Sequence, residues 1–272
     1  MAAAVLLPAA IAPAAQAAPH SETASAGQVS ATLTWQTSTS KGASKVHVTV
    51  SRAGAELVSQ DVQPRCTEFC WEPPGDEPLR LQDLNGDGEP EVLVDLYSGG
   101  AHCCSMLLIY GFDAATGQYL KLRRDFGNPG YTLKDLGSDG QVEILTADDR
   151  FTYLFTSYLE SARPLMILRY DGRTTVDVTR QFPDEIERHA KQLFNFYKRL
   201  RRDKELDVRG VLAAWQADNY LLGRRAAARG WRTLAAAQRR RELKRTGANG
   251  GPAGARYLRK LRSYLKRFGY AG

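Results

Sequence analysis

The stretch "LQDLNGDGEPEVLVDLYSGGAHCC", residues 81–104, joins an acidic loop to an apolar run and two adjacent cysteines. Its run "EVLVDLY", residues 91–97, is rich in apolar and β-branched residues, a composition typical of a buried strand. The loop before it, residues 83–91, carries oxygen-bearing side chains at alternating positions. We therefore expect an ion-binding loop that leads directly into a strand of the core.

The loop offers the oxygen ligands that calcium prefers. Hard oxygen donors, several of them charged, suit Ca²⁺ rather than zinc or copper. Carboxylates crowded together would repel one another without a cation. Gly88 permits the sharp turn that wraps such a loop around one ion. The expected ligands, at loop positions 1, 3, 5 and 9, are the side chains of Asp83, Asn85, Asp87 and Glu91, with the backbone carbonyl of Glu89 at position 7.

Two alternatives for this loop differ in what surrounds it. An EF-hand needs a bidentate Glu at position 12, where this chain has Val94, and it needs helices on both flanks. A hairpin turn rich in Asn, Asp and Gly needs no ion at all. The strand-like run after the loop favours a strand–loop–strand calcium site over the EF-hand and leaves the ion-free turn as the alternative.

This segment resembles the FG-GAP and VCBS-type repeats of integrin-like β-propellers, whose loops follow the pattern D-x-[DN]-x-D-G-x-x-D before a buried strand. The departure is Glu91, where those repeats have Asp. The resemblance implies calcium as cofactor and strands arranged in propeller-like blades. The order of segments, with "GGAHCC" after the loop and "RGVLAAWQADNYLLG" further on, also resembles a family of exported bacterial proteins with no assigned activity.

A second copy of the frame, residues 135–143, begins 52 residues after the first, in "DLGSDGQVEIL". Asp135, Asp139 and Glu143 would be its ligands, but Gly137 provides no side chain at position 3. We therefore expect either a weak second calcium site or an ion-free turn. The repeat itself predicts two similar supersecondary units.

The N-terminal residues 1–17 predict a secretory signal peptide. An apolar run too short to span a membrane ends at the small-residue site Ala15-Gln16-Ala17, which predicts cleavage after Ala17. The run lacks a Lys or Arg near its start, and a plain Ala- and Pro-rich terminus is the alternative. No other stretch approaches the roughly 18 apolar residues of a membrane span. We therefore expect an exported protein, secreted outside the cell or held in the cell envelope.

Four cysteines, Cys66, Cys70, Cys103 and Cys104, fit an oxidising compartment. A bond between adjacent cysteines would be strained, so we expect two bridges that join the Cys66/Cys70 loop to the Cys103–Cys104 pair. The alternative is a zinc site that also uses His102, although the spacing lacks the paired C-x-x-C of most zinc modules.

Hydrophobic periodicity predicts an α+β fold, in which an antiparallel β meander with partial propeller-like repeats precedes a C-terminal helical segment. We expect a polar linker at residues 18–28, a β-rich domain at residues 29–182 and a basic helical region at residues 183–272. Closed propellers have four or more blades. This chain cannot close a ring alone, so we expect the helices to cover exposed strand edges. Strand-like runs include 91–97, 105–111, 118–124, 142–147, 151–156 and 164–170.

Charge is distributed unevenly along the chain. Residues 183–272 hold 23 of the 37 Lys and Arg residues but only 8 of the 30 Asp and Glu residues, a net charge of +15. The rest of the chain is therefore acidic, and the basic helices predict contact with an anionic surface. The expected partners are a cell-wall polymer, a glycan or a protein ligand. Export and the lack of a DNA-binding motif disfavour nucleic acid. The alternative is a solvated helix face that the acidic β region partly neutralises.

No catalytic motif stands out in this sequence. His102 lies near Ser105, but neighbouring positions of a strand point to opposite faces, and the chain has neither a G-x-S-x-G elbow nor a phosphate-binding loop. The sequence therefore favours an exported, calcium-stabilised binding or adhesion-type module of unknown ligand over an enzyme. The alternatives are a secreted hydrolase with a hidden active site and a structural envelope protein anchored by its basic tail.

Overall fold

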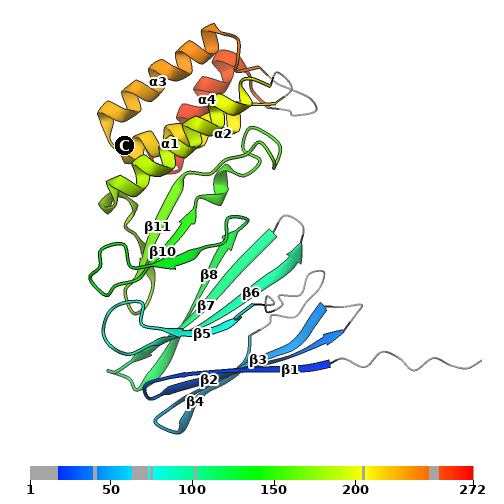
Figure 1. The fold of residues 1–272 in the computed structure, drawn as a ribbon, viewed down its shortest axis with the longest axis vertical. Helices are drawn as coiled ribbons and strands as arrows, with labels where there is room; N and C mark the ends of the chain where they lie inside the picture. The colour runs from blue at the N-terminus through cyan, green and yellow to red at the C-terminus, as the bar shows by residue number, and fades with distance from the viewer. Residues whose placement is uncertain are drawn as a thin grey trace, which may run out of the picture.

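Three antiparallel sheets follow one another along the chain, and four helices follow the sheets (Figure 1). The computed structural model describes residues 18–38, 42–62, 73, 76–100, 103–203, 206–244 and 251–271. The first sheet contains β1 (Ala18–Ala26), β2 (Val29–Ser38), β3 (Gly42–Arg52) and β4 (Ala55–Asp61). The middle sheet contains β5 (Leu79–Gln82), β6 (Glu91–Gly100), β7 (Cys103–Asp113) and β8 (Gln118–Gly127). The third sheet contains β9 (Thr132–Lys134), β10 (Glu143–Ala147), β11 (Leu165–Tyr170) and β12 (Thr175–Asp177).

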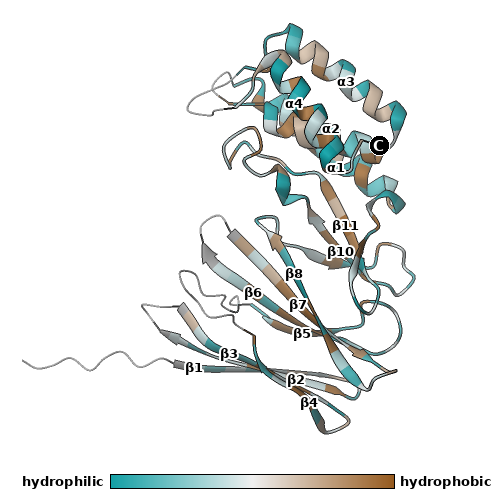
Figure 2. Ribbon diagram, turned by 180° about the vertical axis from the view of Figure 1, so that it is seen from behind, coloured by the Kyte–Doolittle hydropathy of each residue, from teal (hydrophilic) through white to brown (hydrophobic). Residues whose placement is uncertain are grey.

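The two central strands of the middle sheet, β6 and β7, are buried on both faces. Alternate residues of a strand point to opposite sides, and here each side meets a different apolar cluster. Val92, Val94 and Leu96 pack against the first sheet, whereas Leu93 and Leu107 pack against the third sheet. Two-sided burial explains why β6 is an almost continuous apolar run instead of an alternating one. In Figure 2 the hydrophobic colour accordingly follows the strands of this sheet.

Each sheet is a meander of consecutive strands, so the expected antiparallel α+β architecture is confirmed. In the part of the chain that the structure describes, the sheets do not close into a barrel or a propeller ring. The helices lie together beyond the third sheet, at the end of the molecule opposite the first sheet (Figure 1). None of the described helices is long and apolar enough to cross a membrane.

Two expected features of the β region are wrong. Residues 18–26 of the expected linker form β1, which pairs along its whole length with β2. Its side chains are small and polar, so the pairing partner rather than the local composition decides its structure. Residues 151–156, expected as a strand, instead contain the end of the 3₁₀ turn η1 (Asp149–Phe151), followed by turns. Phe151 and Phe155 are buried there against helices, so the apolar run belongs to a helical core.

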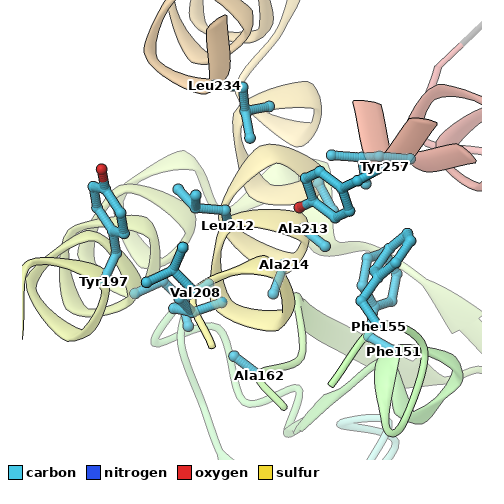
Figure 3. Close-up of a cluster of buried hydrophobic side chains, with 14 of the residues drawn as sticks. Phe151, Phe155, Ala162, Tyr197, Val208, Leu212, Ala213, Ala214, Leu234 and Tyr257 are labelled. Atoms are coloured by element: carbon cyan, nitrogen blue, oxygen red, sulfur yellow. The ribbon is translucent and has the colours of Figure 1, made fainter. Parts of the chain in front are cut away.

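The helical core is built on α1 (Pro183–Leu200), α2 (Arg209–Leu221), α3 (Arg224–Arg239) and α4 (Gly254–Arg267). Pro183 begins α1, as expected for a residue without an N–H to leave unsatisfied. Tyr257 of α4 lies over Phe155, with ring centroids 4.8 Å apart (Figure 3). Tyr257, Leu261 and Leu265 are fully buried, so α4 is docked along its apolar side.

Val208 is the N-cap residue of α2 and makes no side-chain cap hydrogen bond. Asp207 forms a fully buried ion pair with Arg209, whose Nη2 lies 2.5 Å from Asp207 Oδ2. Arg209 also donates to the backbone carbonyl of Pro252 at 2.5 Å, and Tyr257 Oη donates to the carbonyl of Arg209 at 2.7 Å. This buried polar network joins the beginning of α2 to the segment that leads into α4.

Gly230, which weakens α3 as an isolated helix, has a packing reason. A Cβ at this position would lie 1.8 Å from Oε1 of Gln216, a side chain that is fully buried on α2. Gln216 donates through Nε2 to the carbonyl of Ala227 at 3.1 Å. Glycine therefore permits the close approach of α2 and α3 that this hydrogen bond needs.

Candidate functional site

The first acidic loop connects β5 to β6 and folds around its own carboxylates. Asp83 accepts hydrogen bonds from the N–H groups of Gly86, at 2.7 Å, and Gly88, at 2.8 Å. Asp87 accepts one from the N–H of Glu89 at 2.8 Å. Gly86 and Gly88 have φ values of 77° and 86°, which glycine adopts without strain. The carboxylates therefore lie inside the turn, as the sequence pattern predicts.

Glu91, at the last position of the loop, is the buried member of the set. It is only 3% exposed and accepts the N–H of Leu84 through Oε2 at 2.7 Å. Burial, and to a smaller extent the negative charges of Asp87 and Asp83, raise the pKa of Glu91 to about 7. The N–H of Leu84 lowers this pKa but does not compensate for the burial. The protein thus holds a carboxylate in a position where its negative charge is costly.

The second loop repeats the hydrogen-bond pattern of the first. Asp135 accepts the N–H groups of Asp139 and Gly140, and Asp139 accepts the N–H of Gln141. Glu143 accepts the N–H of Leu136 at 2.9 Å, in the place that Glu91 occupies in the first loop. The two frames recognised in the sequence therefore have closely similar local structures, which differ in that Asp83 accepts the N–H of loop position 4 and Asp135 that of position 5.

The two loops differ in the cation that faces the buried glutamate. Glu143 is fully buried and paired with the guanidinium of Arg169, its cross-strand partner on β11. The corresponding neighbour of Glu91 on β7 is Gly111, which follows Tyr110, the partner of Val92. A Cβ on Gly111 would lie 2.3 Å from the hydroxyl of Tyr170, so no arginine fits there. Among the described residues, no Lys or Arg pairs with Glu91.

The first loop is also a junction of the three sheets. The carbonyl of Leu84 accepts the N–H of Val142 from the second loop at 2.9 Å. Glu89 forms an ion pair with Arg52 of β3, in which Nε lies 2.8 Å from Oε1. Leu84 itself is fully buried in the cluster between the middle and third sheets. The loop therefore contacts elements from all three sheets.

The predicted ligands fit calcium in kind, although they are not gathered into a coordination shell. Within the described residues, no three His, Cys, Asp or Glu side chains converge closely enough to hold an ion. Asn85 Nδ2 donates to Asp87 Oδ2 at 3.0 Å, a contact that an ion would replace. The Glu89 side chain is turned toward Arg52, which leaves its backbone carbonyl as the predicted donor. The buried charge of Glu91 is the observation that fits a bound cation.

The cysteine pairing stays a prediction. Cys104 is disulfide-bonded. Cys66 and Cys70, the side chain of Cys103, and the whole of His102 lie outside the described residues, as do the expected signal peptide and its cleavage site.

A serine, a histidine and an aspartate do meet, in a place that the sequence did not indicate. On the first sheet, His47 Nδ1 lies 2.8 Å from Asp61 Oδ1, and His47 Nε2 lies 3.1 Å from Ser59 Oγ. These atoms have the order of a nucleophile, base and orienting acid. However, the side chain of Asp61 is 79% exposed, whereas the acid of such a triad is normally buried. Cross-strand pairing of β3 with β4 is sufficient to explain the contact.

His189 has a structural partner. Its Nδ1 lies 2.7 Å from Oδ2 of Asp218, which is fully buried and accepts the N–H of Leu165 through Oδ1 at 3.0 Å. Burial raises the pKa of Asp218, and the contact with His189 opposes that shift. The pair joins α1 and α2 to the start of β11, which gives His189 a structural role.

A polar cleft of about 930 Å³ between the middle and third sheets was not anticipated. Arg80 donates to Asp95 at 2.6 Å and to the hydroxyl of Tyr131 at 2.5 Å, and that hydroxyl donates to Asp95 at 2.6 Å. Burial raises the pKa of Asp95. These residues are 15 to 51 positions apart, so only Asp95, a charge inside the apolar run, marks the cleft in the sequence.

Comparison with known proteins gives matches over parts of the chain. Residues 186–269 match the family model described as the sll0997 C-terminal domain, a segment that begins in α1 and extends just beyond α4. The chain is 33% identical over 162 residues to "Probable thylakoid lumen protein sll0997" of Synechocystis sp.. It is 32% identical over 142 residues to "Uncharacterized protein y4bJ" of Sinorhizobium fredii.

These matches cover limited shares of the relatives. The alignments span 57% and 50% of this chain, but only 46% of the Synechocystis protein and 21% of the Sinorhizobium protein. No solved structure matches the chain. The names of these relatives mention no calcium-binding repeat, so the resemblance to FG-GAP and VCBS repeats stays a prediction.

The exceptional pKa of Glu91 predicts a pH dependence of stability in calcium-free buffer. The folded state keeps the Glu91 proton up to a pH of about 7, whereas the unfolded chain loses it near the ordinary value of 4.5. The folded state therefore binds more protons in this window, and the free energy of unfolding falls as the pH rises through it. The expected loss is about 3 kcal/mol, at 1.36 kcal/mol for each pKa unit. Urea unfolding at a series of pH values measures it, and Glu91→Gln should flatten the slope. An unchanged slope in that variant would contradict the assignment.

The ion pair in the second loop gives an independent prediction. Arg169→Met leaves Glu143 buried without its cation, so the free energy of unfolding should fall by about 3 kcal/mol. Adding Glu143→Gln in the same chain should restore much of this loss, because the unpaired charge is then gone. Thermal and urea unfolding of the single and double variants measure both effects. Equal stability of wild type and Arg169→Met would show that the pair contributes nothing.

Proposed function

We propose that this protein is an exported, calcium-stabilised binding module. The observation that carries the calcium part is the contrast between two loops of the same structure. Arg169 neutralises Glu143 in the second loop, whereas no described cation pairs with Glu91 in the first. A calcium ion held by the first loop would supply the missing positive charge at the junction of the three sheets.

Calcium at this junction would act on the whole β region. The loop contacts β3 through the Glu89–Arg52 pair and the second loop through the carbonyl of Leu84. An ion that binds only the folded state at a hundred times its Kd stabilises that state by about 2.7 kcal/mol. Because Glu143 already has Arg169, the second loop is the weaker candidate for an ion.

Export is supported by three separate features. The N-terminal residues have the pattern of a signal peptide. Cys104 is disulfide-bonded, which suits an oxidising compartment. The Synechocystis relative is named as a probable thylakoid lumen protein, and a lumenal protein also crosses a membrane to reach its place. A location outside the cell or in its envelope is the finer part of the proposal.

Binding rather than catalysis suits the polar cleft. Its central groups, Arg80, Asp95 and Tyr131, hydrogen-bond to one another, so they offer a polar wall instead of a poised acid or base. Nε of Arg80 is buried there without a partner among the described residues. Tyr97 on the same cleft is 37% exposed and adds an aromatic surface. Such a wall can hold a ligand of unknown identity by hydrogen bonding and apolar contact.

A secreted hydrolase is the second candidate, and the Ser59–His47–Asp61 contact is what favours it. None of these three side chains lines the cleft around Asp95 or the two smaller cavities beside Arg150. The exposed Asp61 is also open to competition from water. The binding module therefore accounts for more of the structure than the hydrolase does.

The calcium proposal predicts a shift in thermal stability that depends on one loop. Adding calcium to chelator-treated protein should raise the melting temperature by several degrees. Asp87→Ala should abolish the shift, because it removes a ligand and a charge. Asp139→Ala, the matched change in the second loop, should leave most of the shift in place. Differential scanning calorimetry measures all three. A melting temperature that responds neither to calcium nor to chelator would overturn the calcium part of the proposal.

The hydrolase alternative has a direct test of its own. A fluorophosphonate probe labels serines activated by a neighbouring base, and we expect no labelling of Ser59. Mass spectrometry of the probe-treated protein, with Ser59→Ala as the blank, decides the matter. Labelling at Ser59 that disappears in His47→Ala would instead establish an activated serine and favour the hydrolase.

A further inference from the structure

The last two helices, α3 and α4, carry many basic residues and no acidic ones. The sequences of α3 and α4 contain no Asp or Glu. The exposed cations of α3 are Arg224, Arg225, Arg229, Arg232 and Arg239. Those of α4 are Arg256, Arg259, Lys260, Arg262, Lys266 and Arg267. We call these residues together the basic face. The helices contact each other, and the guanidinium of Arg262 lies 4.6 Å from the centre of the Trp231 ring across that contact.

The basic face is not neutralised within the described residues. No ion pair joins any of its members to an acidic side chain there, although cations close to it are paired. Arg201 and Arg240 both contact Glu242, and Arg188 contacts Glu185. No acidic side chain of the described β region forms an ion pair with the basic face. An exposed concentration of one sign attracts an oppositely charged partner.

Insertion into a bilayer does not explain the face. An amphipathic helix that lies in a membrane interface buries its apolar side among the lipids. In α4 that side is already used, because Tyr257, Leu261 and Leu265 are fully buried in the helical core. The large hydrophobic side chains exposed in the described part of the chain all lie outside α3 and α4. The exposed side chains of the two helices are mostly charged, with the small residues Ala228, Ala255 and Ser263 between them.

We propose that the basic face binds a flexible polyanion, a polymer that carries phosphate or carboxylate groups along its length. At about 100° per residue, the exposed cations cover an arc of about 160° on α4 and about 140° on α3. A flat surface would contact only the crest of each helix, whereas a flexible chain can follow both arcs. Arginine, which provides most of the face, forms bidentate hydrogen bonds with phosphate and carboxylate groups.

This inference rests on the proposal that the protein is a binding module, and it names the class of its partner. It does not depend on calcium, because the first loop lies in the β region and the basic face lies on the helices at the other end of the third sheet (Figure 1). The two proposals can therefore fail separately.

The test compares two sets of charge-removing changes in the full chain. The face variant carries Arg229→Gln, Arg232→Gln, Arg259→Gln and Lys266→Gln. The control carries Lys121→Gln, Lys134→Gln, Arg173→Gln and Lys191→Gln, which remove the same net charge from exposed positions elsewhere. Fluorescence anisotropy measures binding to labelled inorganic polyphosphate and to polyglutamate. The buffer is free of calcium, since polyphosphate binds that ion, and circular dichroism confirms that both variants fold.

We expect wild type and control to bind similarly and the face variant to bind at least roughly tenfold more weakly, with a shallower dependence on salt because fewer counterions are released. Absence of binding by wild type at low salt, or an equal loss in the control, would overturn the inference. Binding to phosphatidylglycerol vesicles without binding to either polymer would overturn it in favour of a bilayer. A protein that melts higher with calcium but ignores both polymers would contradict this inference alone.

Discussion

Burial of β6 and β7 on both faces is the constraint on which the other features depend. Strands covered on both sides need apolar residues at almost every position, and β6 and β7 send alternate side chains into two separate clusters. A loop that enters such a sheet has no solvated side at its end. Glu91 is the first residue of β6, so its carboxylate is drawn into the core together with the strand. The burial of the Glu91 carboxylate is thus a consequence of the position of β6 in the core.

The buried glutamates of the two loops, Glu91 and Glu143, differ in the groups that surround them. Both loops end in a glutamate that accepts the N–H of the residue after the first aspartate. In the third sheet the neighbouring strand supplies Arg169. In the middle sheet the equivalent place is closed by Tyr170, which packs against Gly111 and donates its hydroxyl proton to the carbonyl of Gly172 at 2.8 Å. The close approach of Tyr170 to Gly111 leaves no room at this point for an arginine like Arg169.

The loops, the strands β6, β7 and β8 of the middle sheet and the helical nature of residues 183–272 could be predicted from the sequence, because each depends on residues close together in the chain. The features that were missed depend on distant partners. β1 has a linker-like composition and becomes a strand only because β2 is beside it. The run at 151–156 has strand-like residues, but its aromatic side chains fill a helical core. Likewise, the Arg169–Glu143 pair and the Arg80–Asp95–Tyr131 cleft appear only when separate strands are brought into register.

In α4 the apolar residues and the cations lie on different sides of the helix. Its apolar residues recur at helical spacing and are buried against α2 and η1, while every cation of α4 points outward. A helix docked by Tyr257, Leu261 and Leu265 cannot also insert those residues into a membrane interface. Docking holds the cations in fixed positions, so their mutual repulsion is overcome by the burial of apolar surface and not by ion pairs. A polyanion that binds the face would relieve that repulsion, and it would meet a surface that folding has already ordered.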